Sequence, residues 1–410
     1  MGDIRTFPAN TTLEKAHEKN PAKKKTVRIV SFLDILQSEF SSSVRFNVLT
    51  YQPEGKREGV WRPWTDADDA NLRLWFQEQH DLYAPRLLDD AFKIFLRQHE
   101  FNPIKDYVDS LAWDGVHRIE YFLPSYAGCD DTPYTREVSR LCFAGGIHRL
   151  YDPGCKFDSA ITLVGPQGTG KSTLVQWLAL CSEWYREITT IVGVRAIEGL
   201  EGGWICEIPE LAALNRNQND VIKAFLSRNA DTYRVPWDKH PVTKPRSCVF
   251  IGTTNDGTFL TDKTGGRRFL PVVCHGDARG IYAHEKVIKE EIRQCWAEAR
   301  ELFRQGKLST VPPVDLLEDF RRVQESVQVD DWREGQIAEF LARKEIGEAT
   351  CVIELWRDAL RMPDTAVPKQ SDSREIMEIA GRIPGWVRTD ERAYFPRYGR
   401  QRCLRKKADC

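Results

Sequence analysis

The segment Ile161–Leu180, ITLVGPQGTGKSTLVQWLAL, decides the fold of this chain. It contains the pattern G-x-x-x-x-G-K-[S/T], with an apolar strand running into a glycine-rich loop and a helix with apolar residues leaving it. Glycines in such a loop let backbone N–H groups turn inward around phosphates, and the helix N-terminus points at the same anion. A glycine-rich turn that matched by chance would need neither the strand nor the helix. The segment therefore predicts a nucleotide-binding loop inside an α/β sheet.

The predicted phosphate site comprises this loop and the first turn of the helix that follows. Lys171 is expected to neutralise the β- and γ-phosphates of ATP, and the Ser172 hydroxyl is expected to complete the shell of a Mg²⁺ ion. The predicted cofactor-binding residues are Gly165, Pro166, Gln167, Gly168, Thr169, Gly170, Lys171, Ser172 and Thr173. ATP and Mg²⁺ are therefore the expected cofactors.

Two glutamates follow the apolar run Trp204–Cys206. An ATPase with this loop needs a carboxylate at the end of a neighbouring strand to hold the metal ion. We expect Glu207 to serve the metal and Glu210 to polarise the attacking water, although the sequence also allows the opposite assignment. The simpler alternative is two solvated glutamates after a buried strand.

A second buried strand, Cys248–Gly252, ends in polar residues that include Asn255. An asparagine at a strand end can contact the γ-phosphate and orient water, whereas the simpler alternative is an ordinary exit into a turn. Arg267 and Arg268 follow a two-glycine turn further along. An arginine that reaches the ATP of a neighbouring subunit would stabilise the charge on the transferred phosphoryl group. Arginine pairs are usually solvated surface, but the order of the motifs favours this role for one of the two.

Composition narrows the class of protein. The chain has 410 residues, of which 41% are hydrophobic and 29% charged, as in a globular protein with a real core. Its apolar stretches are far shorter than the ~18–20 residues of a membrane span. Eleven cysteines without a CxxC pair predict reduced thiols in a cytoplasmic protein and argue against a zinc site. Because the net charge is −1, any nucleic-acid surface has to be local.

Periodicity divides the chain into successive parts. Residues 1–25 are polar and are expected to form a mobile tail. Residues 26–130 predict a mostly helical N-terminal domain, and residues 131–313 predict the α/β domain that carries the phosphate loop. Residues 314–410 predict a helical linker and a winged-helix domain.

The N-terminal part is expected to hold a hairpin and several helices. The alternating stretch Val44–Gln52 predicts a strand, and PEGKREG is expected to turn the chain into a partner strand. One helix is expected to begin at Thr65 or Asp66, either of which can cap it. Further helices are expected over Pro85–His99 and from near Pro103.

In the C-terminal part, IAEFLARKEI, CVIELWRDAL and SREIMEIAGRI each have helical spacing, and residues 385–407 resemble two short strands around a turn. Three helices and a β-wing predict a winged helix, with Ser371–Ile383 as its recognition helix. Basic residues interleaved with aromatic ones gather here, and Arg397, Arg400 and Arg402 are expected to contact DNA phosphates. A winged helix can equally dock a protein.

The order and spacing of these motifs resemble the virulence-associated E family of phage and genomic-island proteins, which is similar to the superfamily 3 helicases of the AAA+ class. The resemblance covers most of the chain. It rests on FNPIKDYVDSLAWDGVHRIEYF (101–122), the phosphate loop, WICEIPEL (204–211), KAFLSRNADTYRVPW (223–237) and FIGTTNDGTFLTDKTGGRRFLPV (250–272). The resemblance implies an AAA+-type P-loop core. It also implies a homo-oligomeric ATPase, which we expect to be a hexamer, that acts on single-stranded or forked DNA. No primase motif stands out, so any priming is expected to come from a partner.

Superfamily 3 helicases place a β-hairpin just before the second buried strand, with basic residues at its tip. By this resemblance, YRVPWDKHPVTKPRSCVF is expected to form the hairpin, with Lys239 and His240 at the tip and Lys244 on the return. The alternative is an ordinary charged loop.

Two functions fit these features. The first is an ATP-dependent DNA motor, a ring-forming superfamily 3-like helicase in phage or mobile-element replication. The second is a nucleotide-switched DNA-binding initiator or interference factor that does not unwind DNA. A small-molecule kinase fits less well because it leaves the asparagine and arginine motifs unexplained.

Overall fold

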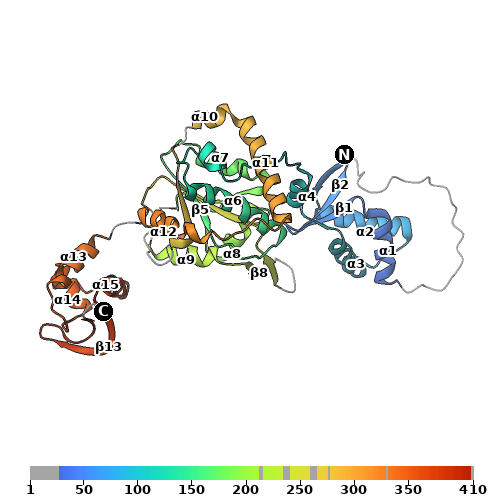
Figure 1. The fold of residues 1–410 in the computed structure, drawn as a ribbon. Helices are drawn as coiled ribbons and strands as arrows, with labels where there is room; N and C mark the ends of the chain where they lie inside the picture. The colour runs from blue at the N-terminus through green and yellow to red at the C-terminus, as the bar shows by residue number, and fades with distance from the viewer. Residues whose placement is uncertain are drawn as a thin grey trace, which may run out of the picture. The chain divides into compact units, whose positions relative to one another are not determined.

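The computed structural model describes residues 27–211, 216–233, 241–258, 266–275, 278–328 and 331–407. The chain forms two compact units, Met1–Gln328 and Val329–Cys410, and each is described by itself. Figure 1 follows the elements along the chain.

A five-stranded parallel sheet forms the centre of the first unit, with the strand order β11-β5-β10-β7-β6. Its strands are β5 (Ala160–Val164), β6 (Tyr185–Glu187), β7 (Ile205–Ile208), β10 (Val249–Thr254) and β11 (Phe269–Val273). Every residue of β5, β7 and β10 is buried, as expected for parallel strands that are covered on both faces. The predicted α/β fold is therefore confirmed for this core.

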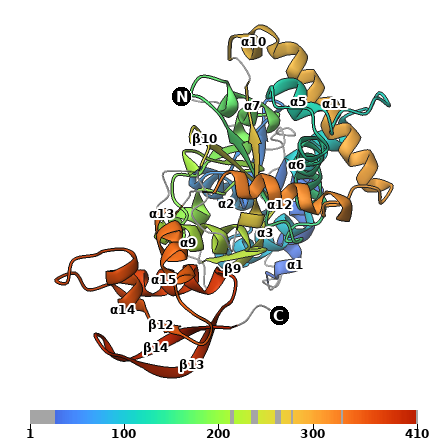
Figure 2. The ribbon, with the colours of Figure 1, turned by 60° about the vertical axis from the view of Figure 1, so that its left-hand side comes forward.

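Alternate residues of each strand face two different helical layers. On one face, Ile161, Leu163 and Ile251 pack into the core formed with α6 (Pro133–Tyr151), α7 (Lys171–Leu178) and α11 (Glu285–Arg304). The indole N–H groups of the buried Trp204 and Trp296 find carbonyl partners there, as buried tryptophans require. Figures 1 and 2 show α6, α7 and α11 together in this layer.

The other face of the sheet is covered by shorter helices. Ala160, Cys206 and Phe250 pack with residues of α8 (Gly193–Glu198) and α9 (Arg216–Leu226). Helix α12 (Leu317–Ser326), which falls within the predicted linker, lies against β11, and its Gln324 side chain donates a hydrogen bond to the Phe269 carbonyl.

The N-terminal elements have a core of their own, around Phe32, Phe76 and Phe95. Helices α1 (Ile29–Phe40), α2 (Asp66–His80) and α3 (Pro85–Gln98) build this core. Helices α4 (Pro103–Ser110) and α5 (Phe122–Tyr126) pack instead into the core formed with α6 and α11. Thr65 caps α2 in a capping box with Asp68, which confirms the predicted helix start. The strands β1 (Val44–Asn47), β2 (Gln52–Arg57), β3 (Val60–Pro63) and β4 (Glu100–Phe101) form a sheet of order β3-β2-β1-β4.

The prediction that PEGKREG forms the turn was wrong. Most of it is strand β2, and the turn is confined to Glu58 and Gly59, which both have positive φ angles of 50° and 82°. Two positive φ angles are typical of a tight two-residue hairpin turn. Glu54 favours the strand because its carboxylate accepts hydrogen bonds from Arg45 and Asn47 across the β1–β2 pair.

The remaining elements of the first unit are short. A two-stranded hairpin, β8 (Ala230–Tyr233) and β9 (Val242–Pro245), stands apart from the parallel sheet. Helix α10 (Ala278–Ala283) precedes α11, and short 3₁₀ segments cover Ser182–Trp184, Gly266–Arg268 and Val314–Leu316. None of the helices in the described ranges has the length and apolar character to cross a membrane. The ten cysteines that the structure describes are all free, and most are buried.

The second unit consists of three helical segments and a three-stranded antiparallel sheet of order β12-β14-β13. Its elements are α13 (Trp332–Ala342), β12 (Ala349–Thr350), α14 (Val352–Glu354) continued by a π-helical turn (Leu355–Ala359), α15 (Gln370–Arg382), β13 (Trp386–Phe395) and β14 (Gly399–Lys406). Ile337, Leu355, Ile376 and Leu404 join these elements in one core. The helices and the two long strands lie where the sequence predicted them, whereas β12 was not predicted.

Candidate nucleotide site

The predicted phosphate loop connects the end of β5 to the start of α7. Gly168 and Gly170 have φ angles of 83° and 84°, which favour glycine, and Gly170 caps α7. A Cβ atom on Gly165 would lie 2.4 Å from the Cys274 carbonyl oxygen, so the backbone after β11 also requires glycine there. The glycines therefore shape the loop itself as well as leaving room for phosphates.

The Lys171 ammonium group points back into this loop. It donates hydrogen bonds to the carbonyl oxygens of Gly165 at 2.6 Å and Pro166 at 2.9 Å, and to the side-chain oxygen of Asn255 at 3.2 Å. Burial lowers the pKa of Lys171, although the nearby negative groups Glu210 and Glu207 oppose this. The lysine and the asparagine that the sequence assigned to one site are thus in direct contact.

Glu207 is a buried carboxylate, 1% exposed, at the end of β7. Three hydroxyl groups donate to it, from Ser172 at 2.7 Å, Thr253 at 2.6 Å and Tyr185 at 2.5 Å. Charge-assisted hydrogen bonds of this kind compensate for the loss of water around a buried carboxylate. Burial and the neighbouring Glu207 carboxylate raise the pKa of Tyr185, so the tyrosine keeps the proton that it donates to Glu207.

This arrangement brings together the two residues predicted to serve the metal. Mg²⁺ keeps several waters and is typically held by one or two carboxylates together with phosphates. A hydroxyl and a carboxylate oxygen 2.7 Å apart at the phosphate loop, on Ser172 and Glu207, are a donor set that fits such an ion. A cluster of three or more acidic, histidine or cysteine ligands is absent from the described part of the chain.

Glu210 lies in a different environment from Glu207. It is exposed, and its carboxylate accepts a hydrogen bond from the Asn255 amide at 3.3 Å. Its φ angle of 48° is unusual for a residue with a side chain, and such backbone conformations cluster at functional sites. Asn255 therefore bridges Lys171 and Glu210 through its oxygen and its nitrogen.

The two arginines differ in their surroundings. Arg268 donates a hydrogen bond from Nε to the Ser227 hydroxyl at 2.9 Å and lies 3.5 Å from the Asp158 carboxylate. Arg267 is exposed, and within the described ranges no hydrogen bond or ion pair engages its guanidinium group. Neither arginine bonds to Lys171 or Glu207 of its own chain in those ranges.

Strands β8 and β9 pair with each other, and β9 lies in the segment 233–250 predicted to form the DNA hairpin, but Lys239 and His240 lie outside the described residues. Lys244 is on the return strand, as predicted, but its ammonium group is engaged by contacts within the chain. It donates to the Leu49 carbonyl at 2.8 Å and lies 3.6 Å from the Glu201 carboxylate, and burial lowers its pKa. DNA contact by the hairpin stays a prediction.

In the second unit, the three predicted arginines are exposed on or beside β14. Arg397 forms an ion pair with Asp358 at 3.1 Å. Arg400 and Arg402 lie opposite Tyr394 and Arg392 in the β13–β14 register. DNA contact by these residues also stays a prediction.

Sequence reasoning missed several residues that build the site. Tyr185 and Thr253 fix Glu207, and Ser227 and Asp158 hold Arg268. Tyr185 gave no signal because it lies on a three-residue strand without an apolar run. The sequence places Thr253 at the end of a buried strand, but only the structure shows that its hydroxyl donates to Glu207.

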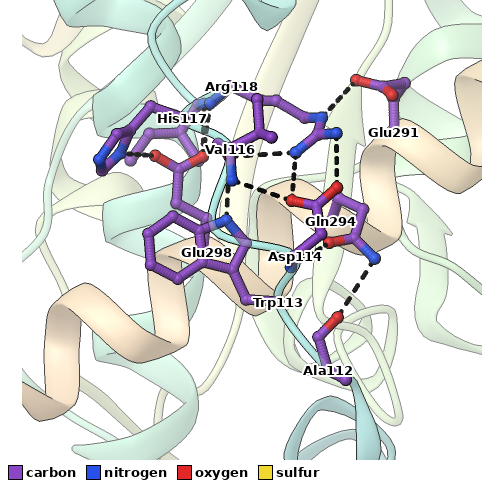
Figure 3. Close-up of polar contacts among 10 residues, drawn as sticks. Ala112, Trp113, Asp114, Val116, His117, Arg118, Glu291, Gln294 and Glu298 are labelled. Carbon is purple, nitrogen blue, oxygen red and sulfur yellow. Dashed lines mark hydrogen bonds and ion pairs between the residues drawn. The ribbon is translucent and has the colours of Figure 1, made fainter.

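The segment Ala112–Arg118 belongs to the stretch 101–122 that carries the family resemblance. Its contacts are structural, as Figure 3 shows. Arg118 bonds to both oxygens of Asp114 and to Glu291 of α11. The buried carboxylate of Glu298 accepts hydrogen bonds from the Arg118 backbone at 2.6 Å and from His117 at 2.8 Å. This segment therefore anchors the chain on α11 and contributes no group to the phosphate loop in the described contacts.

The parallel sheet, the phosphate loop and the acidic strand end define a P-loop NTPase core. Residues 108–329, more than half of the chain, match the family described as Virulence-associated protein E-like domain. The chain belongs to this family, which confirms the resemblance drawn from its motifs.

One solved structure shows the same fold at low sequence identity. The structure titled "The apo structure of NrS-1 C terminal region (305-718)" is 12% identical with a TM-score of 0.51, and the match covers 94% of this chain and 100% of that chain. Two further structures of the NrS-1 C-terminal region are 14% identical, with TM-scores of 0.47 and 0.49. They cover 88% and 87% of this chain and the same shares of their own chains. A comparison with curated proteins gave no match.

Proposed function

We propose that this chain is an ATP-dependent DNA motor, a ring-forming helicase in the replication of a phage or mobile element. The observation that carries the proposal is the hydrogen-bonded series Lys171–Asn255–Glu210, beside the Ser172–Glu207 pair. Five residues from three separate stretches of sequence meet at one sheet edge, and their chemistry suits ATP hydrolysis. The family membership supports the setting in phage or genomic-island replication.

The environments of the two glutamates suggest a division of labour. Glu207 is buried and bonded to Ser172, so we assign it to Mg²⁺, which would neutralise charge on the β- and γ-phosphates. Glu210 is exposed and oriented by Asn255, so we assign it to the attacking water. Asn255 would hold both that carboxylate and Lys171 at the γ-phosphate, which is the positioning task on which phosphoryl transfer depends.

The arginines support a shared site between subunits. Arg268 is bonded within its own chain, whereas Arg267 next to it is exposed, so we assign Arg267 to the ATP of a neighbouring subunit. A head-to-tail interface in which one subunit completes the site of the next is heterologous, and it gives a ring when the rotation between subunits closes. A hexamer is the assembly that we expect.

DNA contact is assigned to two surfaces. The first is the β8–β9 hairpin, together with Lys239 and His240, which the sequence predicts as its basic residues, and the second is the exposed face of β13 and β14. We interpret the second unit as a winged helix whose wing carries Arg400 and Arg402 to the phosphate backbone.

The deciding experiment measures ATP hydrolysis with and without single-stranded DNA, with Lys171→Ala as the blank. We expect DNA to stimulate hydrolysis and the stimulation to vanish in the variant, and strand displacement on a forked substrate is the next assay. Hydrolysis that is indifferent to DNA would contradict the motor and favour a nucleotide-switched initiator or interference factor. DNA-stimulated hydrolysis without strand displacement would also favour that alternative.

A further inference from the structure

A tyrosine that the motifs do not include lies against the phosphate loop. The Tyr282 hydroxyl on α10 is 3.0 Å from the Thr173 hydroxyl in the first turn of α7, and either group can donate the hydrogen bond. The rings of Tyr282 and Trp177 meet edge to face, with their centroids 6.2 Å apart at 84°. Figures 1 and 2 both show α10 next to α7.

The sheet order places this tyrosine on the side of the loop away from the hydrolytic groups. Glu207 lies near the end of β7 and Asn255 follows β10, and both strands lie on one side of β5. Tyr282 follows β11, which lies on the other side of β5. Since the γ-phosphate must face Glu207 and Asn255, the other end of the nucleotide leaves the loop towards β11 and α10.

Thr173 marks the place where the nucleoside begins. Lys171 serves the β- and γ-phosphates and Ser172 serves the metal between them, so the next residue of α7 lies nearest the α-phosphate. The ribose is attached to that phosphate. A side chain bonded to Thr173 is therefore within reach of the ribose and the base.

The exposure of Tyr282 suits a ligand contact better than a core contact. The residue is 59% exposed, although its hydroxyl and one ring edge are held by Thr173 and Trp177. An aromatic ring that is fixed in orientation but open to solvent offers a stacking surface at little cost in side-chain entropy. Trp177 is itself covered by the Lys289 ammonium group, 5.3 Å from its ring, which limits its own availability.

We propose that Tyr282 stacks on the base of the bound purine nucleotide and so fixes the nucleoside end of the ATP site. This assignment rests on the proposed ATP site but not on its coupling to DNA. Stacking acts on the ring and not on the phosphates, so Tyr282 adds affinity for a nucleoside triphosphate and none for inorganic triphosphate.

Calorimetric titration of the full chain with Mg·ATP and with Mg·tripolyphosphate, in the absence of DNA, tests this role. We expect Tyr282→Ala to weaken ATP binding about 10-fold and to leave tripolyphosphate binding unchanged. Tyr282→Phe keeps the ring and is expected to bind ATP within about threefold of the parent chain. Val287→Ala, at an exposed position of α11, is the matched control and should leave both affinities unchanged.

The outcomes separate this inference from the proposed function. Equal weakening of ATP and tripolyphosphate by Tyr282→Ala would show a structural effect on the loop and overturn the stacking role, as would unchanged ATP affinity. The DNA dependence of hydrolysis enters neither titration, so failure of the motor proposal leaves this test intact. Lys171→Ala should weaken the binding of both ATP and tripolyphosphate, and that result would confirm that both ligands occupy the phosphate loop.

Discussion

At the scale of single residues, the central feature is a buried carboxylate surrounded by hydroxyl groups. Glu207 accepts from Ser172, Thr253 and Tyr185, which belong to a helix, a central strand and an edge strand. Only Ser172 is expected to turn towards a metal ion, because the other two hydroxyls lie on the strands that flank β7. Thr253 and Tyr185 therefore hold the carboxylate in position while Ser172 changes partners.

This reasoning predicts a measurable effect for Tyr185→Phe. The substitution removes one hydrogen bond to Glu207 and keeps the ring, so the carboxylate becomes less firmly oriented. Loss of a group that orients a metal ligand typically costs about 10–100-fold in metal affinity or activity. We expect the Mg²⁺ concentration for half-maximal ATP hydrolysis to rise by about 10-fold. Tyr83→Phe, at an exposed N-terminal tyrosine, should leave it unchanged, and an unaltered Mg²⁺ requirement in Tyr185→Phe would contradict the assignment.

At the scale of elements, a buried ion pair fixes the base of the β8–β9 hairpin. Arg246 contacts Asp231 through two hydrogen bonds of 2.6 and 3.0 Å, and both side chains are buried. The same guanidinium group donates to the Phe225 carbonyl of α9 and lies over the Phe225 ring. The hairpin is thereby tied to the helix that covers the sheet.

Removing one partner of this pair should be costly. Asp231→Ala leaves a buried, unpaired arginine, and we expect the free energy of unfolding to fall by about 3–5 kcal/mol. Denaturant titration gives this value, with Asp89→Ala as the matched control. Asp89 pairs with Arg73 at 3.1 Å on the surface, where both side chains are more than 40% exposed. That change should cost at most about 1 kcal/mol, and similar losses in the two variants would argue against a special role for the buried pair.

The β13–β14 pair shows a different balance between stability and binding. Arg392 and Arg402 lie directly opposite each other, and like charges in this position destabilise a sheet. We expect Arg402→Ala to leave the fold equally or slightly more stable in thermal unfolding. If the wing contacts phosphates, the same change should lower the slope of log affinity against log salt concentration by about 1. An unchanged salt slope would exclude Arg402 from DNA binding.

The elements that the sequence predicted are those with a strong local pattern. Strands β5 and β10 are continuous apolar runs, and α2 begins with a capping box. Strand β6 has no such pattern, because Tyr185–Glu187 pair with β7 without being buried as an apolar run. Strand β2 was misinterpreted because proline and glycine are typical of turns, whereas its pairing with β1 depends on the Glu54 contacts across the strands.

The candidate site follows the same division between local pattern and tertiary contact. Lys171, Ser172 and Glu207 were predictable because a loop motif and an apolar strand place them at the same sheet edge. The environments of Arg267 and Arg268 could not be predicted from the sequence. Ser227 and Asp158, which hold Arg268, come from distant parts of the chain. The attachment of Lys244 to Leu49 likewise depends on how the N-terminal elements pack against the hairpin.

At the scale of the whole molecule, the site is expected to be completed by a second copy of the chain. A subunit with Arg267→Ala keeps its own phosphate loop but cannot serve its neighbour. A subunit with Lys171→Ala cannot use ATP but still presents Arg267. Each variant alone should therefore lose hydrolysis, by about 10³-fold or more for the arginine variant.

Mixing the two variants should restore part of the activity. In a ring assembled from equal amounts, about a quarter of the interfaces combine an intact loop with an intact arginine, because each occurs independently in half of the subunits. Recovery near that fraction after mixing, measured as steady-state ATP hydrolysis, would establish a shared site. Arg267→Ala should unfold at the same temperature as the parent chain because the side chain is exposed, whereas Arg268→Ala should unfold lower because it loses Ser227 and Asp158. If both variants assemble and yet no activity returns, Arg267 acts within its own subunit or not at all.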